Sequence, residues 1–324
     1  MDTLPCIEEI KSFIDAHECF TLVCHVSPDG DTLGSAFALS NILRSMGKQT
    51  EVICCEEAPK VYRAFLPGIE ELKLPDDAFG YDSVITVDCA DLVRTGSAEK
   101  IANQAKYTLN IDHHKTNDMY AQINCVDGEA AAVGELIFKL AQSLGFVFDV
   151  DTAVCVYTAI MTDTGNFSYS NTSAFTFEAA SKLKAVGIDS CNINRMVYRS
   201  VPYNKLKLTG LAINKMQLAL DGRFGYCALT RAEMASVGAA DVSVEGIIDN
   251  IRDVETVEFA AFIHEKEEKT FRVSLRSKNV VDVGKVAARM GGGGHARAAG
   301  YTAYGEVKQV EAQLLEMAEN ELNG

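Results

Sequence analysis

The sequence lacks an apolar run of about 18 residues, the length that a membrane-spanning helix needs. Its first residues also lack a basic stretch followed by an apolar one, the pattern typical of a secretory signal peptide. Ten cysteines are present, but they form no Cys-x-x-Cys pair, and several lie inside apolar runs, namely Cys24, Cys89, Cys155 and Cys227. Buried free thiols in a reducing compartment explain this pattern better than disulfides do. We therefore expect a soluble, cytoplasmic protein with no membrane contact.

Positive charge is scarce, with 30 Lys+Arg against 45 Asp+Glu and a net charge of −15. Strong, non-specific binding to long nucleic acid normally needs a basic face, so this balance argues against it. Residues 1–204 hold 15 Lys+Arg and 28 Asp+Glu, a net charge of −13, whereas residues 205–324 hold 15 and 17, a net charge of −2. The nearly neutral second part can therefore meet an anionic substrate without a large electrostatic penalty.

The chain is longer than a single core usually supports, so two domains are expected in 324 residues. The first 165 or so residues alternate apolar runs with amphipathic helical patterns, which predicts a mostly parallel α/β sheet. The expected strands are Cys19–His25, Gln49–Cys54, Asp82–Asp88 and Tyr107–Asp112, and the expected helices are Asp31–Met46, Ala131–Leu144 and Thr152–Met161.

A different pattern begins near residue 216 and predicts a second, smaller α/β domain. Its expected strands are Met216–Leu220, Phe224–Leu229, Val257–His264 and Phe271–Arg276, followed by a glycine-rich loop and the helix Val307–Leu322. We place the catalytic domain at 1–190, a helical linker at 191–207 and the second domain at 208–324. The active site is expected in the cleft between the two domains.

Acids and histidines follow the predicted strands at the point where each strand ends. They are His25, Asp29, Asp31, Asp88 and the run Asp112-His113-His114, and Asp163 follows an apolar helix. Taken singly, each acid is ordinary turn or helix-cap chemistry. Ligands of parallel α/β sheets bind beyond the carboxyl ends of the strands, however, so together these side chains indicate one site.

Four of these carboxylates would repel one another unless cations offset them, namely Asp29, Asp31, Asp88 and Asp163. Two divalent ions supply the matching charge. Oxygen and imidazole ligands without thiolate suit Mn²⁺ or Mg²⁺, and the histidines favour Mn²⁺. Asp88 lies centrally among the motifs and is the natural bridging ligand. Paired ions activate water and clamp a phosphate, so the pattern predicts metal-dependent phosphate hydrolysis.

The glycine run Gly291–Gly294 predicts a nest of backbone N–H groups around an anion. His295 and Arg297 follow it directly and add hydrogen-bond donors, and Arg276 can supply another. A flexible linker would more often contain serine and lack these flanking residues.

In sequence order, His25-x-x-x-Asp29-x-Asp31, Asp88, Asp112-His113-His114 and Asp163 resemble the four motifs of the DHH phosphoesterase superfamily. Gly292-Gly293-Gly294-His295-x-x-Ala298 resembles the signature of its DHH-associated C-terminal domain. The resemblance covers nearly the whole chain, and it is to the NrnA-type branch, described as nano-RNases and phosphatases of 3′-phosphoadenosine-5′-phosphate (pAp).

The resemblance implies a role for each matching residue. One metal would take His25, Asp29 and Asp88, and the other Asp31, Asp88, His113 and Asp163. His114 would lie beside the substrate phosphate, with Asp112 behind it. Substrate binding is expected at a group in the second domain: Arg276, Ser277, Gly293, Gly294, His295 and Arg297.

The expected substrates are short RNA, linear dinucleotides and pAp, and a homodimer is compatible with the resemblance. An enzyme acting on cyclic dinucleotides or their linear products, such as c-di-AMP and pApA, shares the same two domains and motifs and stays open. A non-catalytic nucleotide sensor also stays open, although the complete ligand set disfavours it.

Overall fold

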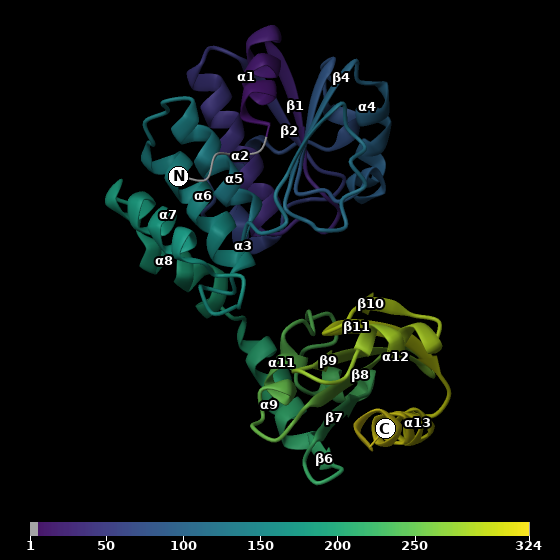
Figure 1. Cartoon of the computed structure of the whole chain (residues 1–324). Helices are drawn as coiled ribbons and strands as arrows, with labels where there is room; N and C mark the ends of the chain where they lie inside the picture. Colours follow the sequence, from purple (N-terminus) through teal and green to yellow (C-terminus); the bar gives the residue numbers. More distant parts are fainter. Residues whose placement is uncertain (1–5, 324) are drawn as a thin grey trace. The chain divides into compact units, whose positions relative to one another are not determined.

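The computed structural model describes residues 6–323, and the chain divides into two compact units, Met1–Ser200 and Val201–Gly324. Each unit has its own sheet, and its labelled strands can be followed in Figure 1. Each unit also has its own apolar core. The prediction of a two-domain α/β protein is therefore confirmed.

The N-terminal unit contains a five-stranded sheet in the order β2-β1-β3-β4-β5, and all its strand pairs are parallel. The strands are β1 (Cys19–Val23), β2 (Gln49–Ile53), β3 (Ser83–Val87), β4 (Tyr107–Asp112) and β5 (Ile123–Val126). Four of them match the expected strands to within two residues, and β5 was not expected.

Helices cover both faces of this sheet, because successive side chains of a strand point to opposite faces. Leu22 and Ile85 pack into the larger core, whereas their neighbours Val23 and Val84 pack against Ala102 on the other face. The larger core lies under α1 (Ile7–Ala16), α2 (Gly30–Ser45), α5 (Val133–Ser143), α6 (Val150–Asp163) and α7 (Ala174–Ala185). The opposite face is covered by the 3₁₀ segment η3 (Leu92–Ala98) and by α4 (Glu99–Gln104). Shorter turns complete the unit: α3 (Lys60–Arg63), η1 (Ile69–Glu71), η2 (Pro75–Asp77) and α8 (Ser190–Asn194).

Helices α2 and α6 approach each other so closely that two positions of α2 admit only glycine. A Cβ atom at Gly34 would lie 2.4 Å from the carbonyl oxygen of Cys155, and one at Gly30 would lie 2.5 Å from the Thr162 side chain. Ordinary Cβ contacts are longer than 3.4 Å. Since α2 begins beside Asp31 and α6 ends at Asp163, this packing brings two of the predicted metal ligands together.

The segment predicted as a helical linker, 191–207, is helical with one break. It comprises the end of α8, the π-helical turn η4 (Arg195–Arg199), the break at 200–202 and the start of α9 (Tyr203–Lys215). Helix α9 continues past residue 207, and its buried residues Leu208 and Ala212 pack into the core of the C-terminal unit.

The C-terminal unit contains a six-stranded sheet in the order β10-β11-β9-β8-β7-β6, in which only β7 and β8 pair in parallel. The strands are β6 (Gln217–Ala219), β7 (Phe224–Leu229), β8 (Phe259–Glu267), β9 (Thr270–Ser277), β10 (Gly293–His295) and β11 (Ala298–Tyr304). Helices α12 (Val283–Arg289) and α13 (Val307–Asn323) cover one face, and α9, α10 (Arg231–Ser236) and α11 (Ile247–Arg252) cover the other.

The glycine-rich segment is not the open loop that the sequence suggested. Gly293 to His295 form strand β10, which pairs with β11 through Gly293–Gly300 and His295–Ala298. Close packing explains two of these glycines, because a Cβ atom at Gly292 would lie 2.3 Å from the Gly300 carbonyl oxygen and one at Gly294 would lie 2.5 Å from the Ala298 carbonyl oxygen. The expected phosphate nest is therefore replaced by a hairpin.

All ten cysteines lie among residues 6–323 and are free thiols, and Cys24, Cys89, Cys155 and Cys227 are buried as expected. Within the same residues, none of the helices combines the length and the apolar character needed to cross a membrane.

Candidate active site

The predicted site residues of the N-terminal unit meet at the carboxyl edge of its sheet. Strands β1, β3 and β4 are neighbours in that sheet, and all three point the same way. His25 lies two residues beyond β1, Asp88 follows β3 directly, and Asp112 is the last residue of β4. The parallel arrangement alone therefore gathers three of the four motifs.

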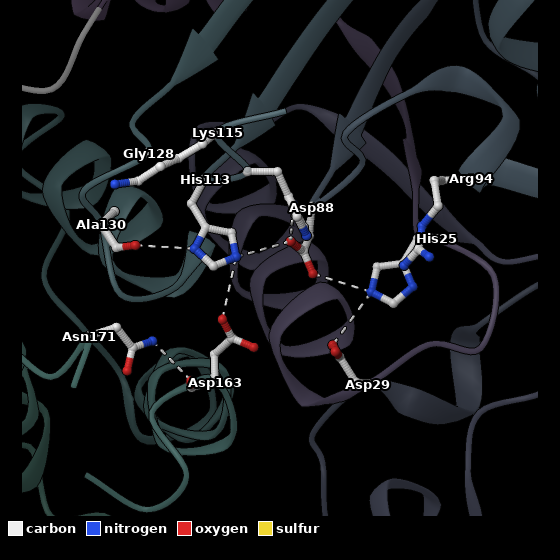
Figure 2. A pocket seen from close by; sticks show the side chains of 11 residues that line it. His25, Asp29, Asp88, Arg94, His113, Lys115, Gly128, Ala130, Asp163 and Asn171 are labelled. Carbon is white, nitrogen blue, oxygen red and sulfur yellow. Dashed lines mark hydrogen bonds and ion pairs between the residues drawn. The ribbon is translucent and has the colours of Figure 1, made fainter. Parts of the chain in front are cut away.

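His25, Asp29 and Asp88 form the first cluster. The Nε2 atom of His25 lies 3.2 Å from Asp88 Oδ2 and 3.6 Å from Asp29 Oδ1 (Figure 2). Its Nδ1 atom lies 2.7 Å from the Val26 carbonyl oxygen and donates to it, which leaves Nε2 as the ring nitrogen that faces the two carboxylates. Burial opposes protonation, but the hydrogen bonds to Asp29 and Asp88 outweigh it and raise the pKa of His25 to about 10.

Asp29 has a second task as the N-cap of α2. Its Oδ1 atom accepts hydrogen bonds from the backbone N–H groups of Asp31 at 3.0 Å and Thr32 at 3.1 Å. Burial pushes the pKa of Asp29 upward, but the His25 hydrogen bond and these backbone donors overcome it and leave that pKa below its usual value. Asp29 can therefore cap α2 and also be available as a metal ligand.

Asp31, His113 and Asp163 form the second cluster. His113 Nε2 lies 3.3 Å from Asp163 Oδ2, 3.6 Å from Asp88 Oδ1 and 3.9 Å from Asp31 Oδ2. Its Nδ1 atom lies 3.1 Å from the Ala130 carbonyl oxygen, so this imidazole also presents Nε2 to the carboxylates (Figure 2). Both ring orientations are those that metal-binding histidines need.

Asp31 belongs to α2 and is fully buried, and its side chain lies against the N-terminus of α5. Its carboxylate accepts from the backbone N–H of Val133 at 2.7 Å and of Gly134 at 3.0 Å, and from Ser35 Oγ at 3.0 Å. Burial, with the charges of Asp88 and Asp163 added to it, nevertheless holds the pKa of Asp31 well above its usual value. The donors orient the carboxylate but do not supply the counter-charge it needs.

Asp88 links the two clusters. Its backbone is left-handed, with φ 61°, a conformation that costs about 1–3 kcal/mol at most residues and concentrates at functional sites. Its Oδ1 atom is buried and has no hydrogen-bond partner among the described residues. Burial raises the pKa of Asp88, although hydrogen bonding to His25 opposes the rise. An orphaned carboxylate oxygen facing two histidines is what a bridging metal ligand would leave in a structure of the protein groups alone.

His114 and Asp112 form a supporting pair beside these clusters. His114 Nδ1 donates to Asp112 Oδ1 at 2.7 Å and lies 3.5 Å from Asp88 Oδ1. Asn117 donates to Asp112 Oδ2 at 2.5 Å and to Asn110 Oδ1 at 2.8 Å, so the buried carboxylate is fixed from both sides. The Asp112 hydrogen bond raises the pKa of His114, which favours a cationic imidazole in the pocket.

Within residues 6–323, three groups of side chains could each hold a metal ion, since their ligand atoms lie within 4.8 Å of one another. They are His25, Asp29 and Asp88; Asp31, His113 and Asp163; and Asp88, His113 and His114. The structure thus brings all six predicted metal ligands together. The donor set of carboxylates and imidazoles, the orphaned Asp88 oxygen and the two fixed tautomers fit divalent cations.

A cavity of about 370 Å³ opens over these clusters. Besides the predicted residues, it is lined by three polar side chains that the sequence did not single out, Arg94, Lys115 and Asn171 (Figure 2). Lys115 is paired with Glu129 at 2.6 Å, and Asn171 donates to the carbonyl oxygens of Ala131 and Asp163, each at 3.1 Å. No short motif marks these positions.

The predicted substrate-binding residues of the C-terminal unit lie around the β10–β11 hairpin. His295 and Gly293 are exposed on it, and Gly294 adopts a positive φ of 143° beside Ala298. Arg276, on β9, is half-buried and lies 3.9 Å from Asp249. These groups leave polar atoms available on the surface of the unit.

Ser277 and Arg297 are engaged differently. Ser277 is buried, and its hydroxyl donates to the Val281 carbonyl oxygen at 2.6 Å. Arg297 donates to the same carbonyl at 2.9 Å and to that of Asn279. Both side chains hold the hairpin against the segment after β9, a structural task that the sequence did not suggest.

Comparison with known proteins agrees with this architecture. Residues 20–160 match the DHH family N-terminal domain, and residues 229–324 match the DHHA1 domain. A protein of Bacteroides fragilis described as exopolyphosphatase-related superimposes with a TM-score of 0.89 at 27% identity, covering 98% of this chain and 97% of that one.

Two relatives carry the name bifunctional oligoribonuclease and PAP phosphatase NrnA. The protein from Thermus thermophilus is 30% identical over 93% of this chain and 89% of its own length. The protein from Bacillus subtilis is 25% identical over 91% of this chain and 93% of its own length. With the domain order, the ligand clusters and these relatives together, the chain belongs to the DHH phosphoesterase superfamily and, within it, to the NrnA-type proteins.

Proposed function

We propose that this protein is a phosphoester hydrolase that cleaves short oligoribonucleotides and linear dinucleotides and removes a phosphate from pAp. The names of its relatives from Thermus thermophilus and Bacillus subtilis support both activities. The observation that carries the proposal is Asp88, whose unpartnered buried oxygen lies between two groups of potential metal ligands.

We further propose that two divalent ions, preferably Mn²⁺, occupy the site. His25, Asp29 and Asp88 would hold one ion, and Asp31, Asp88, His113 and Asp163 the other. When bound, such ions lower the pKa of the attacking water and offset the charge of the attacked phosphate. The choice of manganese rests on the mixture of imidazole and carboxylate ligands.

The protein's own side chains would orient the substrate and donate a proton or a hydrogen bond to it. His114 lies at the cavity with its Nδ1 committed to Asp112, so its Nε2–H is the donor left for a phosphate oxygen or the leaving oxygen. The hydrogen bond to Asp112 raises the pKa of His114, so this donor persists to higher pH than it would in a free histidine. Asp112 and Asn117 contribute by fixing the ring and do not touch the substrate.

The C-terminal unit is proposed to bind the part of the substrate that does not react. His295 and Arg276 are the donors available for a terminal phosphate, and Gly293 and Gly294 leave room beside them. For Ser277 and Arg297 we now propose an indirect contribution, because their polar groups already hold the hairpin. We also propose that the protein is cytoplasmic, where it would have access to short RNA and pAp.

The decisive experiment is a turnover assay on purified full-length protein. Mn²⁺-loaded protein would be incubated with pAp, pApA, RNA of two to five nucleotides and c-di-AMP, and the products separated by chromatography. Hydrolysis of pAp and short RNA that chelation abolishes is the expected result. Cleavage of c-di-AMP in preference to both would favour the cyclic-dinucleotide alternative, and no hydrolysis of any substrate would overturn the enzymatic proposal in favour of a sensor.

A further inference from the structure

Arg94 is a cation of the active-site cavity that none of the roles above uses. It belongs to η3 and follows Asp88 by six residues, and it lines the cavity with His25, Asp29 and Asp88. Its guanidinium makes no hydrogen bond or ion pair with any group in the part of the chain that the structure describes. Arg94 is exposed to solvent at the cavity, so its guanidinium is open to an anionic ligand.

The backbone around Arg94 is held firmly against the loop that carries His25. The N–H of Val26 donates to the Arg94 carbonyl oxygen at 2.7 Å, and the N–H of Arg94 donates to Asp91 Oδ1 at 2.9 Å. Two residues on, Gly96 has a φ of 59°, and a Cβ atom there would lie 2.6 Å from Cys55 Sγ and 2.8 Å from Val26 Cγ1. The base of the Arg94 side chain is therefore fixed at the rim of the cavity.

The charges that line the cavity make Arg94 decisive for anion binding. The four ligand carboxylates contribute four negative charges, which two divalent ions would balance. Lys115, on another part of the lining, is already neutralised by Glu129 at 2.6 Å. His114 is likewise paired with Asp112. Among the cationic and imidazole side chains that line the cavity within residues 6–323, Arg94 is therefore the one without a carboxylate partner.

Building on the proposed function, we infer that Arg94 binds the non-bridging oxygens of the scissile phosphate and favours a phosphomonoester over a phosphodiester. A guanidinium presents paired N–H donors that match two phosphoryl oxygens. The terminal phosphate of pAp carries a second negative charge that an internucleotide phosphate lacks, so the same cation stabilises the monoester more. Arg94 would thus give this one site its phosphatase activity alongside its nuclease activity.

The test compares Arg94→Gln and Arg94→Lys with the wild type on pAp and pApA, using full-length Mn²⁺-loaded protein. Loss of a charge-assisted hydrogen bond should lower kcat/KM for pAp by roughly 30-fold in Arg94→Gln and for pApA by less than about 5-fold. Arg94→Lys should fall between the wild type and Arg94→Gln, since it keeps the charge but loses the paired donors. Arg63→Gln is the matched control, and we expect it to change either value by less than about 2-fold, because Arg63 pairs with Glu57 on the surface and does not line the cavity.

A binding measurement separates this inference from the proposed function. The dissociation constant of inorganic phosphate, measured by calorimetry on the Mn²⁺-loaded protein, should rise about tenfold in Arg94→Gln with the bound manganese unchanged. If phosphate binding stays within 3-fold of the wild type, or if pAp and pApA are impaired equally, the inference is wrong even though wild-type hydrolysis stands. Loss of manganese from Arg94→Gln would also overturn it. If the wild type hydrolyses neither substrate, the proposed function fails, and phosphate binding alone still decides on Arg94.

Discussion

Replacing Asp163 with asparagine should stabilise the metal-free protein while weakening its response to metal. Asp163 is the last residue of α6, where the helix dipole disfavours a negative charge. Burial raises the pKa of Asp163 to about 6; His113 opposes this rise, and the charges of Asp88 and Asp29 add to it. An asparagine of the same shape removes the charge and keeps the packing.

The size of the effect follows from the pKa. The folded value of about 6 lies above the 3.8 of an unperturbed aspartate, so the folded state holds the proton more tightly. The difference of about two units corresponds to a penalty of up to about 3 kcal/mol for the ionised group. The side chain is 30% exposed, and solvent screening should reduce this to about 1–2 kcal/mol. The penalty is absent below about pH 4 and complete above about pH 6.

The assay is urea unfolding followed by circular dichroism, since the sequence contains no tryptophan to serve as a fluorescence probe. In EDTA at pH 8, Asp163→Asn should be about 1–2 kcal/mol more stable than the wild type, and the difference should vanish near pH 4. With Mn²⁺ at a hundred times its dissociation constant, the wild type should gain about 2.7 kcal/mol and the variant much less. A variant that is less stable than the wild type in EDTA at pH 8, or that gains as much from Mn²⁺, would refute the reasoning.

Four further substitutions test other parts of the structure. Asp88→Ala should lower kcat at least about 1,000-fold, whereas Arg276→Ala should mainly raise KM for dinucleotides; steady-state kinetics with equal, modest losses would contradict a shared ligand. Asn117→Ala should lower kcat about tenfold with little change in KM, because it loosens the pair behind His114, and an altered KM alone would argue against that role. Burial lowers the pKa of His264 to about 4, and neither of its ring nitrogens has a hydrogen-bond partner among residues 6–323. The free energy of unfolding of the wild type should therefore fall as the pH drops from about 6.5 to about 4. His264→Phe should abolish that loss in pH-dependent urea unfolding, and an unchanged pH profile would count against it.

The metal-binding half of the site could be predicted because it depends on regular structure. His25, Asp88 and Asp112 each follow a strand of alternating α/β pattern, and parallel strands end at one edge by construction. Asp163 could be added because an apolar helical run ends there. At these positions the local sequence pattern also determines where the residue lies in the folded domain.

Other features depend on contacts that no local pattern records. Arg94 is positioned by an irregular segment whose course is set by Val26 and Gly96. Strand β11 begins Ala-Ala-Gly, which has little strand propensity, so its pairing with the glycine run was not foreseen. Without that partner strand, the glycines resembled an anion nest. The cause for Gly292 is close approach to Gly300, eight residues further along the chain, and for Gly294 it is close approach to Ala298.

The contact between α2 and α6 has a consequence for the chemistry that is visible only from the packing. Gly34 touches no ligand, yet its missing side chain sets how near the start of α2 comes to the end of α6. A backbone contact in the apolar core thus determines the separation of Asp31 from Asp163. The same contact determines the space available to a metal ion. A single methyl group added there would act as a spacer in the coordination geometry. In this protein, helix packing in the core determines the spacing of the residues at the metal site.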